Sequence, residues 1–242
     1  MSNYVNIKIE NDPYRGGIQI TSTAIASDVS SINSIVISRT ATNSSHWTKM
    51  QTIDISSVED LNFSCFDITA KSGVNYDYTV DVIGADSLMP IESNYYGPVK
   101  CSFEGLFVGD YKKQYVAGTN FKTETKRNTQ VEYVTTLSGR YPYRISNAET
   151  NYTTGTSSGL FLRLTDDKKK FVPDYDHSYS NEVLDFLTDN MSKIIKTHDG
   201  QAWYVSIDAN PSKIYSDFYG MNAVTFNWTE IGELPPLGMV ID

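Results

Sequence analysis

The chain has 242 residues, a length that suits two domains or one large all-β domain, and we expect two. Its 20 basic and 29 acidic residues give a formal net charge of −9, which opposes binding to nucleic acid or to an anionic membrane. Its two cysteines, Cys65 and Cys101, are too few for a disulfide scaffold or a cysteine metal cluster, so we expect both to be free, partly buried thiols.

The N-terminal stretch MSNYVNIKIENDPYRGG lacks the basic end and the apolar run of a signal peptide. No apolar stretch approaches the ~20 residues that span a bilayer. We therefore expect synthesis in the cytosol and no membrane partner.

The first 97 residues divide into short alternating runs separated by turn-rich pieces such as ENDPYRGG, TATNSS and TAKSG. Runs of this kind at this spacing are typical of a sandwich of antiparallel strands. In SGVNYDYTVDV, the period of two places one set of side chains on a single face: Val74, Tyr76, Tyr78, Val80 and Val82. We expect that face to be core.

This segment resembles the fibronectin type III module, whose penultimate strand carries a tyrosine just after a turn. Tyr76 occupies that place. The module usually also has a tryptophan in its second strand. Here that strand is GIQITSTAI, and the nearest tryptophan is Trp47, further along the chain.

The charge balance changes after YYGPVKC. Residues 1–97 hold 5 basic and 11 acidic residues, whereas residues 98–242 hold 15 and 18. We therefore expect one domain over 1–97, a second over 98–233, and a C-terminal arm over 234–242.

The second half opens with strand-like runs, from GLFVGD through SGLFLRL, that include the long polar stretch NFKTETKRNTQVEYVTT. The pattern then changes to helical spacing at Val183, Leu184, Leu187 and Met191. Ser180 is placed to cap this helix, with Glu182 and Asp185 near its start.

After the helix, THDGQ separates the strand-like runs KIIK and AWYVSI, and Asp-Gly at such a point is a strong hairpin signal. We therefore expect His198 and Asp199 at an exposed turn rather than in a reactive site. In the last strand, Val224, Phe226 and Trp228 share one face.

Recognisable catalytic and metal motifs are absent from the sequence. His46, His177 and His198 lie in polar turn contexts, and none has a partner at a zinc spacing. The chain also lacks the nucleophile-elbow, zinc-protease, phosphate-loop and dinucleotide signatures. We expect no enzyme activity, no catalytic residues, no metal and no cofactor.

Two further patterns in the sequence partly match known types of site. Asp174, Asp176, Ser178 and Asp185 imitate positions of a calcium loop, but Tyr179 replaces the glycine that such a loop needs at its sixth position. Scattered carboxylates also occur that could pair for glycoside hydrolysis, although no spacing places two of them across a cleft.

The chain is rich in aromatic residues, with 17 tyrosines, 10 phenylalanines and 3 tryptophans. Strand alternation assigns many of these rings to sheet cores. Four tyrosines are left without a clear core position and are candidates for subunit contacts or for a glycan-binding surface: Tyr95, Tyr96, Tyr141 and Tyr143.

The tail ELPPLGMVID is apolar and broken by prolines, which disfavour ordinary strand pairing. It lies along its own domain or docks on a neighbour, and we predict that it docks on another chain. The candidate assembly residues are Leu234, Pro235, Pro236, Leu237, Met239 and Val240.

Three phrases in residues 137–234 resemble tail proteins of bacteriophages and phage-like particles of Gram-positive bacteria: LSGRYPYRISNAETNYTTGTSSGLF, DFLTDNMSKIIKTHDGQAWYVSIDANP and FNWTEIGE. The expected order of strands, one helix, a hairpin and a final strand is similar to the split β-barrel of tail-tube and distal-tail subunits. The resemblance implies a mainly β protein with a fibronectin type III-like sandwich followed by a split-barrel-like domain with one short helix.

The same resemblance implies a structural component of a phage tail or baseplate, located in the virion and made in the host cytoplasm. Its partners would be other copies of itself in a ring and neighbouring tail or baseplate proteins, with no nucleic acid contact beyond a possible tail lumen. Identical neighbours would cover the edges of NFKTETKRNTQVEYVTT. The alternative function is a carbohydrate-binding or adhesion module on a virion or cell surface.

Overall fold

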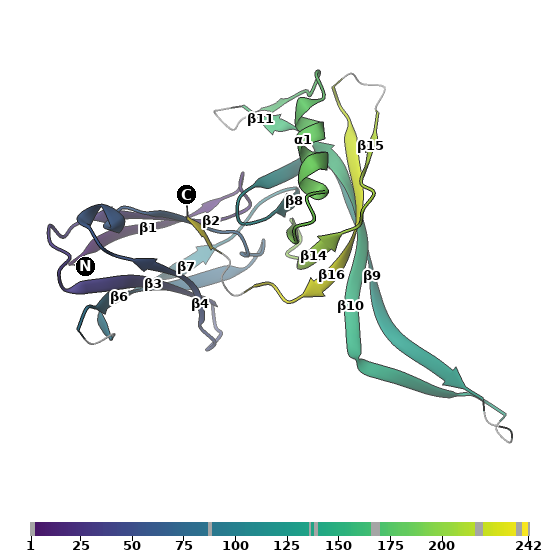
Figure 1. Cartoon of the computed structure of the whole chain (residues 1–242), viewed down its shortest axis with the longest axis horizontal. Coiled ribbons are helices and arrows are strands. Elements are labelled where there is room, and N and C mark those ends of the chain that lie inside the picture. Colours follow the sequence, from purple (N-terminus) through teal and green to yellow (C-terminus); the bar gives the residue numbers. More distant parts are fainter. Residues whose placement is uncertain are drawn as a thin grey trace. The chain divides into compact units, whose positions relative to one another are not determined.

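The computed structural model of the chain is mainly β, with a single α-helix among its described elements (Figure 1). This confirms the mainly β class expected from the sequence. Among the described residues, no helix has the length and apolar character needed to cross a membrane. The structure describes residues 3–86, 89–135, 137, 140–165, 170–215, 220–235 and 239–241, with the backbone alone at 130, 147–150 and 239–241.

The chain divides into two compact units that differ from the expected domains. The first unit combines residues 1–116, 194–202 and 234–242, and the second combines residues 117–193 and 203–233. The sequence predicts a boundary at residue 97 and a separate C-terminal arm instead. After residue 116 the chain returns to the first unit twice, at residues 194–202 and 234–242. A change of charge at one point of the sequence therefore could not reveal the boundaries between the two units.

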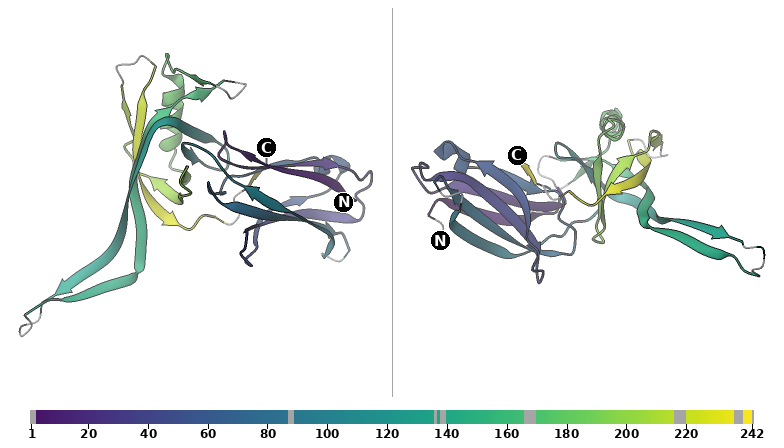
Figure 2. Two further views of the ribbon diagram at one scale, coloured as in Figure 1. Left: turned by 180° about the vertical axis from the view of Figure 1, so that it is seen from behind. Right: turned by 60° about the horizontal axis from the view of Figure 1, so that its bottom comes forward.

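The first unit contains two four-stranded antiparallel sheets, visible as two layers in Figure 2. One sheet has the order β1-β2-β5-β17, formed by Val5–Asp12, Gly17–Ala24, Ser64–Asp67 and Met239–Ile241. The other has the order β4-β3-β6-β7, formed by Thr48–Asp54, Ile32–Ala41, Asn75–Gly84 and Pro90–Lys100. A short 3-10 helix, η1 (Val58–Leu61), precedes β5.

The inner faces of these sheets close on one apolar core because their strands alternate. Tyr76, Tyr78, Val80 and Val82 of β6 are buried, as the period of two predicts, and Val74 packs against them. Burying a side chain of this size stabilises the fold by about 1.5–3 kcal/mol. The alternating strands therefore supply the main driving force for the first unit.

Both cysteines contribute to this core as free thiols. Cys65 lies in β5 and Cys101 directly follows β7, and neither is solvent-accessible. The expectation of free thiols is confirmed, although both are fully rather than partly buried.

The first unit also includes β8 (Leu106–Gly109), which pairs antiparallel with β13 (Lys193–Thr197). After β13, the predicted turn at His198 and Asp199 is present. The Thr197 N–H donates to the Gln201 carbonyl at 3.0 Å, and Gly200 adopts a φ of 88°. Both His198 and Asp199 are exposed.

The second unit is built around β16 (Ala223–Gly232). One edge of β16 pairs with β10 (Tyr143–Phe161), and the other pairs with β14 (Ala202–Ile207) and β15 (Ser212–Ile214). The remaining strands are β9 (Gln114–Val134), β11 (Arg163–Leu164) and β12 (Phe171–Val172).

The expected inward face of β16 is confirmed. Val224, Phe226 and Trp228 are all at most 1% exposed. The Trp228 indole N–H donates to Ser157 Oγ at 2.9 Å, and the ring lies 5.0 Å from that of Trp203. The buried indole therefore has its polar atom satisfied, as a core tryptophan requires.

The helix α1 (Ser178–Leu187) begins earlier than predicted. Its buried face includes Val183 and Leu187, as expected, but Met191 lies beyond the helix and is 63% exposed. Asp174 rather than Ser180 caps the first turn, because its carboxylate accepts the Tyr179 and Ser180 N–H groups at 3.0 and 2.8 Å.

Candidate functional site

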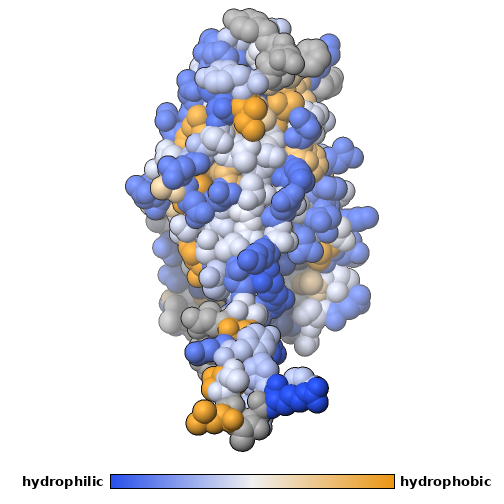
Figure 3. All heavy atoms as spheres, turned by 90° about the vertical axis from the view of Figure 1, so that its right-hand side faces the viewer, coloured by the Kyte–Doolittle hydropathy of each residue, from blue (hydrophilic) through white to orange (hydrophobic). Residues whose placement is uncertain are grey.

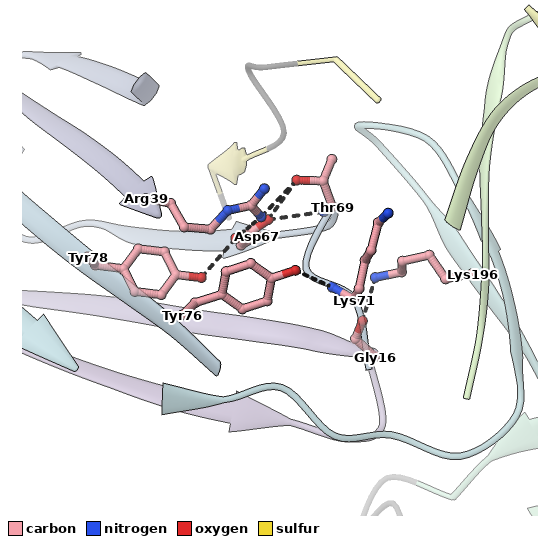
Figure 4. Close-up of polar contacts among 8 residues, drawn as sticks. All are labelled: Gly16, Arg39, Asp67, Thr69, Lys71, Tyr76, Tyr78 and Lys196. Carbon is pink, nitrogen blue, oxygen red and sulfur yellow. Dashed lines mark hydrogen bonds and ion pairs between the residues drawn. The ribbon is translucent and has the colours of Figure 1, made fainter. Parts of the chain in front are cut away.

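A buried polar cluster joins the two sheets of the first unit (Figure 4). Arg39 of β3 donates to Asp67 of β5 at 2.6 Å and to Thr69 Oγ1 at 3.0 Å. The Tyr78 hydroxyl donates to Asp67 Oδ2 at 2.8 Å, and Thr69 donates through its N–H and hydroxyl to Oδ1, both at 3.0 Å. The Asp67 carboxylate is therefore saturated with donors.

Burial controls the protonation of this cluster. Burial, followed by the nearby Asp67 charge, raises the pKa of Tyr78 well above its usual value. Burial is the largest single effect on the pKa of Arg39 and would lower it, but the charge of Asp67, the nearby Tyr78 and Tyr76 and the hydrogen bond to Asp67 together raise that pKa. Asp67 is fully buried, so no substrate can reach it, and the cluster acts as a link between sheets.

Two further buried polar groups lie beside this link. The Tyr76 hydroxyl accepts the Lys71 N–H at 3.0 Å, and the Arg39 guanidinium lies 4.7 Å from the centre of its ring. Lys196 of β13 donates to the Gly16 carbonyl and lies over the rings of Phe103 and Phe107. Burial lowers the pKa of Lys196 to about 8.

The hairpin formed by β9 and β10 extends from the rest of the second unit (Figure 1). The two strands pair from Val134 and Tyr143 back to Ala117 and Phe161. β16 covers the other edge of β10 only over residues 154–160. Among the described strands, β10 toward the turn therefore has β9 as its single neighbour.

Both faces of this hairpin are open to solvent near its turn. Residues 132–135 and 141–146 are all exposed, whereas a strand on a sheet with one covered face would alternate. Exposed apolar or aromatic side chains there include Tyr133, Val134, Tyr141, Tyr143 and Ile145. Figure 3 shows apolar surface in orange at the hairpin's end, at the bottom of the view.

An open cavity of about 650 Å³ marks the point where β10 diverges from β16. Arg127, Tyr152 and Glu233 are among the residues that line it. The Thr153 N–H donates to the Glu230 carboxylate at 2.7 Å, so a side chain takes the place of a strand partner there. The strand edge is thus left open from this point toward the turn.

The charge of the hairpin differs in sign from that of the rest of the chain. Residues 119–152 hold five basic and three acidic residues, whereas the remainder holds 15 and 26. Because the hairpin carries a net positive charge, it is suited to contact with an acidic surface. The rest of a second copy of the chain offers such a surface.

The four candidate tyrosines do not form one surface. Tyr95 and Tyr96 lie in β7 of the first unit, whereas Tyr141 and Tyr143 lie at the hairpin end of the second. Tyr95 is 60% exposed, but Tyr96 packs against the core. Sequence reasoning missed that Trp47 joins Tyr95, because their meeting depends on strand order.

The C-terminal arm is used differently from the prediction. Leu234 and Pro235 are half-buried, and Pro236 and Leu237 lie outside the described residues. The backbone of Met239 and Val240 pairs with Asp67 and Phe66 of β5 in the same chain. The prediction that the prolines prevent strand pairing is therefore wrong for the residues after them, because a proline interrupts the chain only locally.

The residues that imitate a calcium loop in the sequence make helix-capping and turn contacts in the structure. The Asp176 carboxylate accepts the Ser178 N–H at 3.1 Å, while Asp174 caps the first turn of α1. Among the residues that the structure describes, no group of three or more histidine, cysteine, aspartate or glutamate side chains has a metal-binding arrangement.

No protein-family model matches the chain, and a search of curated proteins finds no match.

Proposed function

We propose that the chain is a structural subunit of a phage tail or baseplate, in which neighbouring copies assemble through the β9–β10 hairpin. The observation that carries the proposal is the hairpin with exposed faces and an open β10 edge. An isolated two-stranded ribbon is marginally stable in water, and an open strand edge is a template for pairing. Contact with identical neighbours would remove both liabilities.

The contact that we propose is head-to-tail. The β9 edge of one copy would meet the β10 edge of the next, and the adjoining strands would run antiparallel. Such a heterologous contact generates a closed ring when the rotation between copies closes. Neighbouring tail or baseplate proteins would then bind the faces of that ring.

Features of both units support the resemblance behind this proposal. In the first unit, β1-β2-β5 and β4-β3-β6-β7 follow the strand order expected for a fibronectin type III-like sandwich. The Tyr76 hydroxyl bonds back to the Lys71 backbone, as a corner tyrosine would. In the second unit, one helix accompanies the sheet that carries the hairpin, in keeping with the proposed split barrel.

The test combines light scattering, electron microscopy and directed crosslinking. Thr129 on β9 and Ile145 on β10 are not opposite each other within one hairpin, because their partners are Asn151 and Glu132. With a bismaleimide, the double variant Thr129→Cys/Ile145→Cys should yield a ladder of crosslinked chains. Each single variant should yield no ladder beyond a dimer.

A monomer at all concentrations, absent from purified particles, would refute the proposal. The four tyrosines do not form the single surface that the alternative of a glycan-binding module needs, since Tyr96 is partly buried against the core and the exposed rings are divided between the two units. A glycan array with the whole chain tests that alternative directly.

A further inference from the structure

An exposed aromatic pair crosses the outer face of the sheet β4-β3-β6-β7. Trp47 directly precedes the edge strand β4, and Tyr95 lies in the opposite edge strand β7. Their ring centroids are 6.5 Å apart, and the ring planes are inclined at 76°. Trp47 is 40% and Tyr95 60% exposed, so the two rings form an aromatic corner that is open to solvent.

A buried carboxylate lies on the same face of this sheet. Asp77 of β6 stands opposite Thr40 of β3, and both side chains are at least nine-tenths buried. A hydrogen bond to Asp77, and then burial and the Asp77 charge, raise the pKa of the Tyr95 hydroxyl. Thr79, two residues after Asp77 on the same face of β6, stands opposite Tyr95 of β7, so Asp77 and Tyr95 share this face of the sheet.

One oxygen of the Asp77 side chain is left unused by the described part of the chain. Its Oδ1 is buried and has no hydrogen-bond partner there. Gly97, with a φ of 148°, passes so close that a Cβ at that position would lie 2.4 Å from Oδ1. The absence of a side chain at Gly97 thus leaves room for the carboxylate.

The burial of Asp77 Oδ1 determines which class of ligand could bind at the aromatic corner. Because Oδ1 is covered, a sugar hydroxyl cannot reach it to donate a hydrogen bond. An electrostatic attraction, by contrast, acts across several ångströms and is strengthened beside a protein interior. A cation over the faces of tryptophan and tyrosine rings is also attracted by their π systems.

From this arrangement we propose that Trp47, Tyr95 and Asp77 form a binding site for a quaternary ammonium group. Such a group carries a full positive charge and needs no hydrogen-bond acceptor, so the covered oxygen suits it better than it suits a primary amine. The surroundings are favourable, since residues 1–97 hold 11 acidic and 5 basic residues. This site is independent of the hairpin and of assembly.

The test uses choline and its neutral isostere 3,3-dimethylbutan-1-ol as probes. Tryptophan fluorescence reports on the site because Trp47 is exposed, whereas Trp203 is half-buried and Trp228 is buried. Choline should change the emission in a saturable way at millimolar concentration. The neutral isostere and n-butylammonium should each bind at least tenfold more weakly.

Variants identify the residues responsible. Asp77→Asn keeps the shape but removes the charge, and Trp47→Ala removes one wall, so each should weaken choline binding at least tenfold. Because Trp47→Ala also removes the reporter, its binding is measured by calorimetry. Tyr14→Ala removes another exposed tyrosine of the first unit and should change the affinity less than twofold.

Several outcomes would overturn the proposal. These are equal binding of choline and its isostere, full affinity in Asp77→Asn, or binding of neutral trisaccharides in place of choline. Loss of self-association in Trp47→Ala without any choline binding would instead make the corner a subunit contact. Phosphocholine in solution and phosphatidylcholine vesicles, compared after choline binding is established, distinguish a free group from one on a surface.

Discussion

At the scale of single residues, the Arg39–Asp67 pair is a buried ion pair that joins the two sheets of the first unit. We predict that Asp67→Ala lowers the free energy of unfolding by roughly 3–5 kcal/mol, because it leaves the buried Arg39 guanidinium without its negatively charged partner and the Tyr78 hydroxyl without its acceptor. Urea unfolding followed by circular dichroism measures this loss.

The matched control is an ion pair on the surface of the same unit. Lys8 and Glu10 form an ion pair at 2.8 Å, but their side chains are 72% and 53% exposed. Glu10→Ala should therefore cost less than about 1 kcal/mol. If Asp67→Ala and Glu10→Ala lowered the free energy of unfolding by similar amounts, burial would not be what makes the Arg39–Asp67 pair important.

The second prediction at this scale concerns the buried Lys196. Its pKa is about 8 in the folded state against an ordinary value of 10.5, so the unfolded chain binds more protons between these pH values. Stability from this group therefore rises with pH from about 8 to 10.5, by about 3 kcal/mol in all at 1.36 kcal/mol per pKa unit.

Comparison with Lys196→Met cancels the contributions of titrating groups that do not interact with Lys196, whereas the Cys101 thiol does interact with it electrostatically. Cys101 acts in the opposite direction, since burial raises the pKa of its thiol from 9.0 to about 12 and stability is lost as pH rises above 9. The wild-type chain should gain stability relative to Lys196→Met as pH increases from 8 to 10.5. If the difference in free energy of unfolding between the two chains did not vary with pH, the lowered pKa of Lys196 would be contradicted.

At the scale of elements, the start of α1 depends on one carboxylate. Asp174 accepts two N–H groups of the first turn and is 6% exposed. Asp174→Ala should lower the free energy of unfolding by about 1–2 kcal/mol, in the range of lost helix caps. Thermal unfolding followed by near-UV circular dichroism is the measurement.

Asp176 supplies the control for this cap. It accepts the Ser178 N–H at 3.1 Å, but it is exposed, so water can replace it in Asp176→Ala. The loss should be clearly smaller than for Asp174→Ala. The reverse order would place the effective cap at Asp176.

At the scale of the whole molecule, the C-terminal strand should stabilise the first unit. Removing residues 234–242 takes β17 from the edge of β5 and exposes backbone groups that were paired. We predict that the free energy of unfolding of the first unit falls by roughly 1–3 kcal/mol, as expected for the loss of a few hydrogen bonds. Urea unfolding detects it.

The second unit provides an internal control in the same experiment. Trp203 and Trp228 both belong to it, so the part of the fluorescence transition that they report should keep its midpoint. Unchanged stability of the first unit, combined with weaker self-association, would restore the original prediction that the arm docks on another chain.

The sequence by itself determined the features that depend on near neighbours. The buried face of β6, the inward face of β16 and the turn at Gly200 follow from alternation and from glycine's access to positive φ. The existence of α1 also followed from spacing. The exact start of α1 did not follow, because the capping residue, Asp174, lies four residues before the helix. A carboxylate at that distance looks in the sequence like part of an ordinary polar loop.

Only the tertiary structure decided which distant segments meet. The return of residues 194–202 and β17 to the first unit, the Arg39–Asp67 link and the corner of Trp47 and Tyr95 all depend on strand order. The physical reason is that an alternating strand specifies which face is buried but leaves its two edges equivalent. Which edges pair is settled by the packing of the complete chain, and so are the buried charges and exposed rings that this pairing brings together.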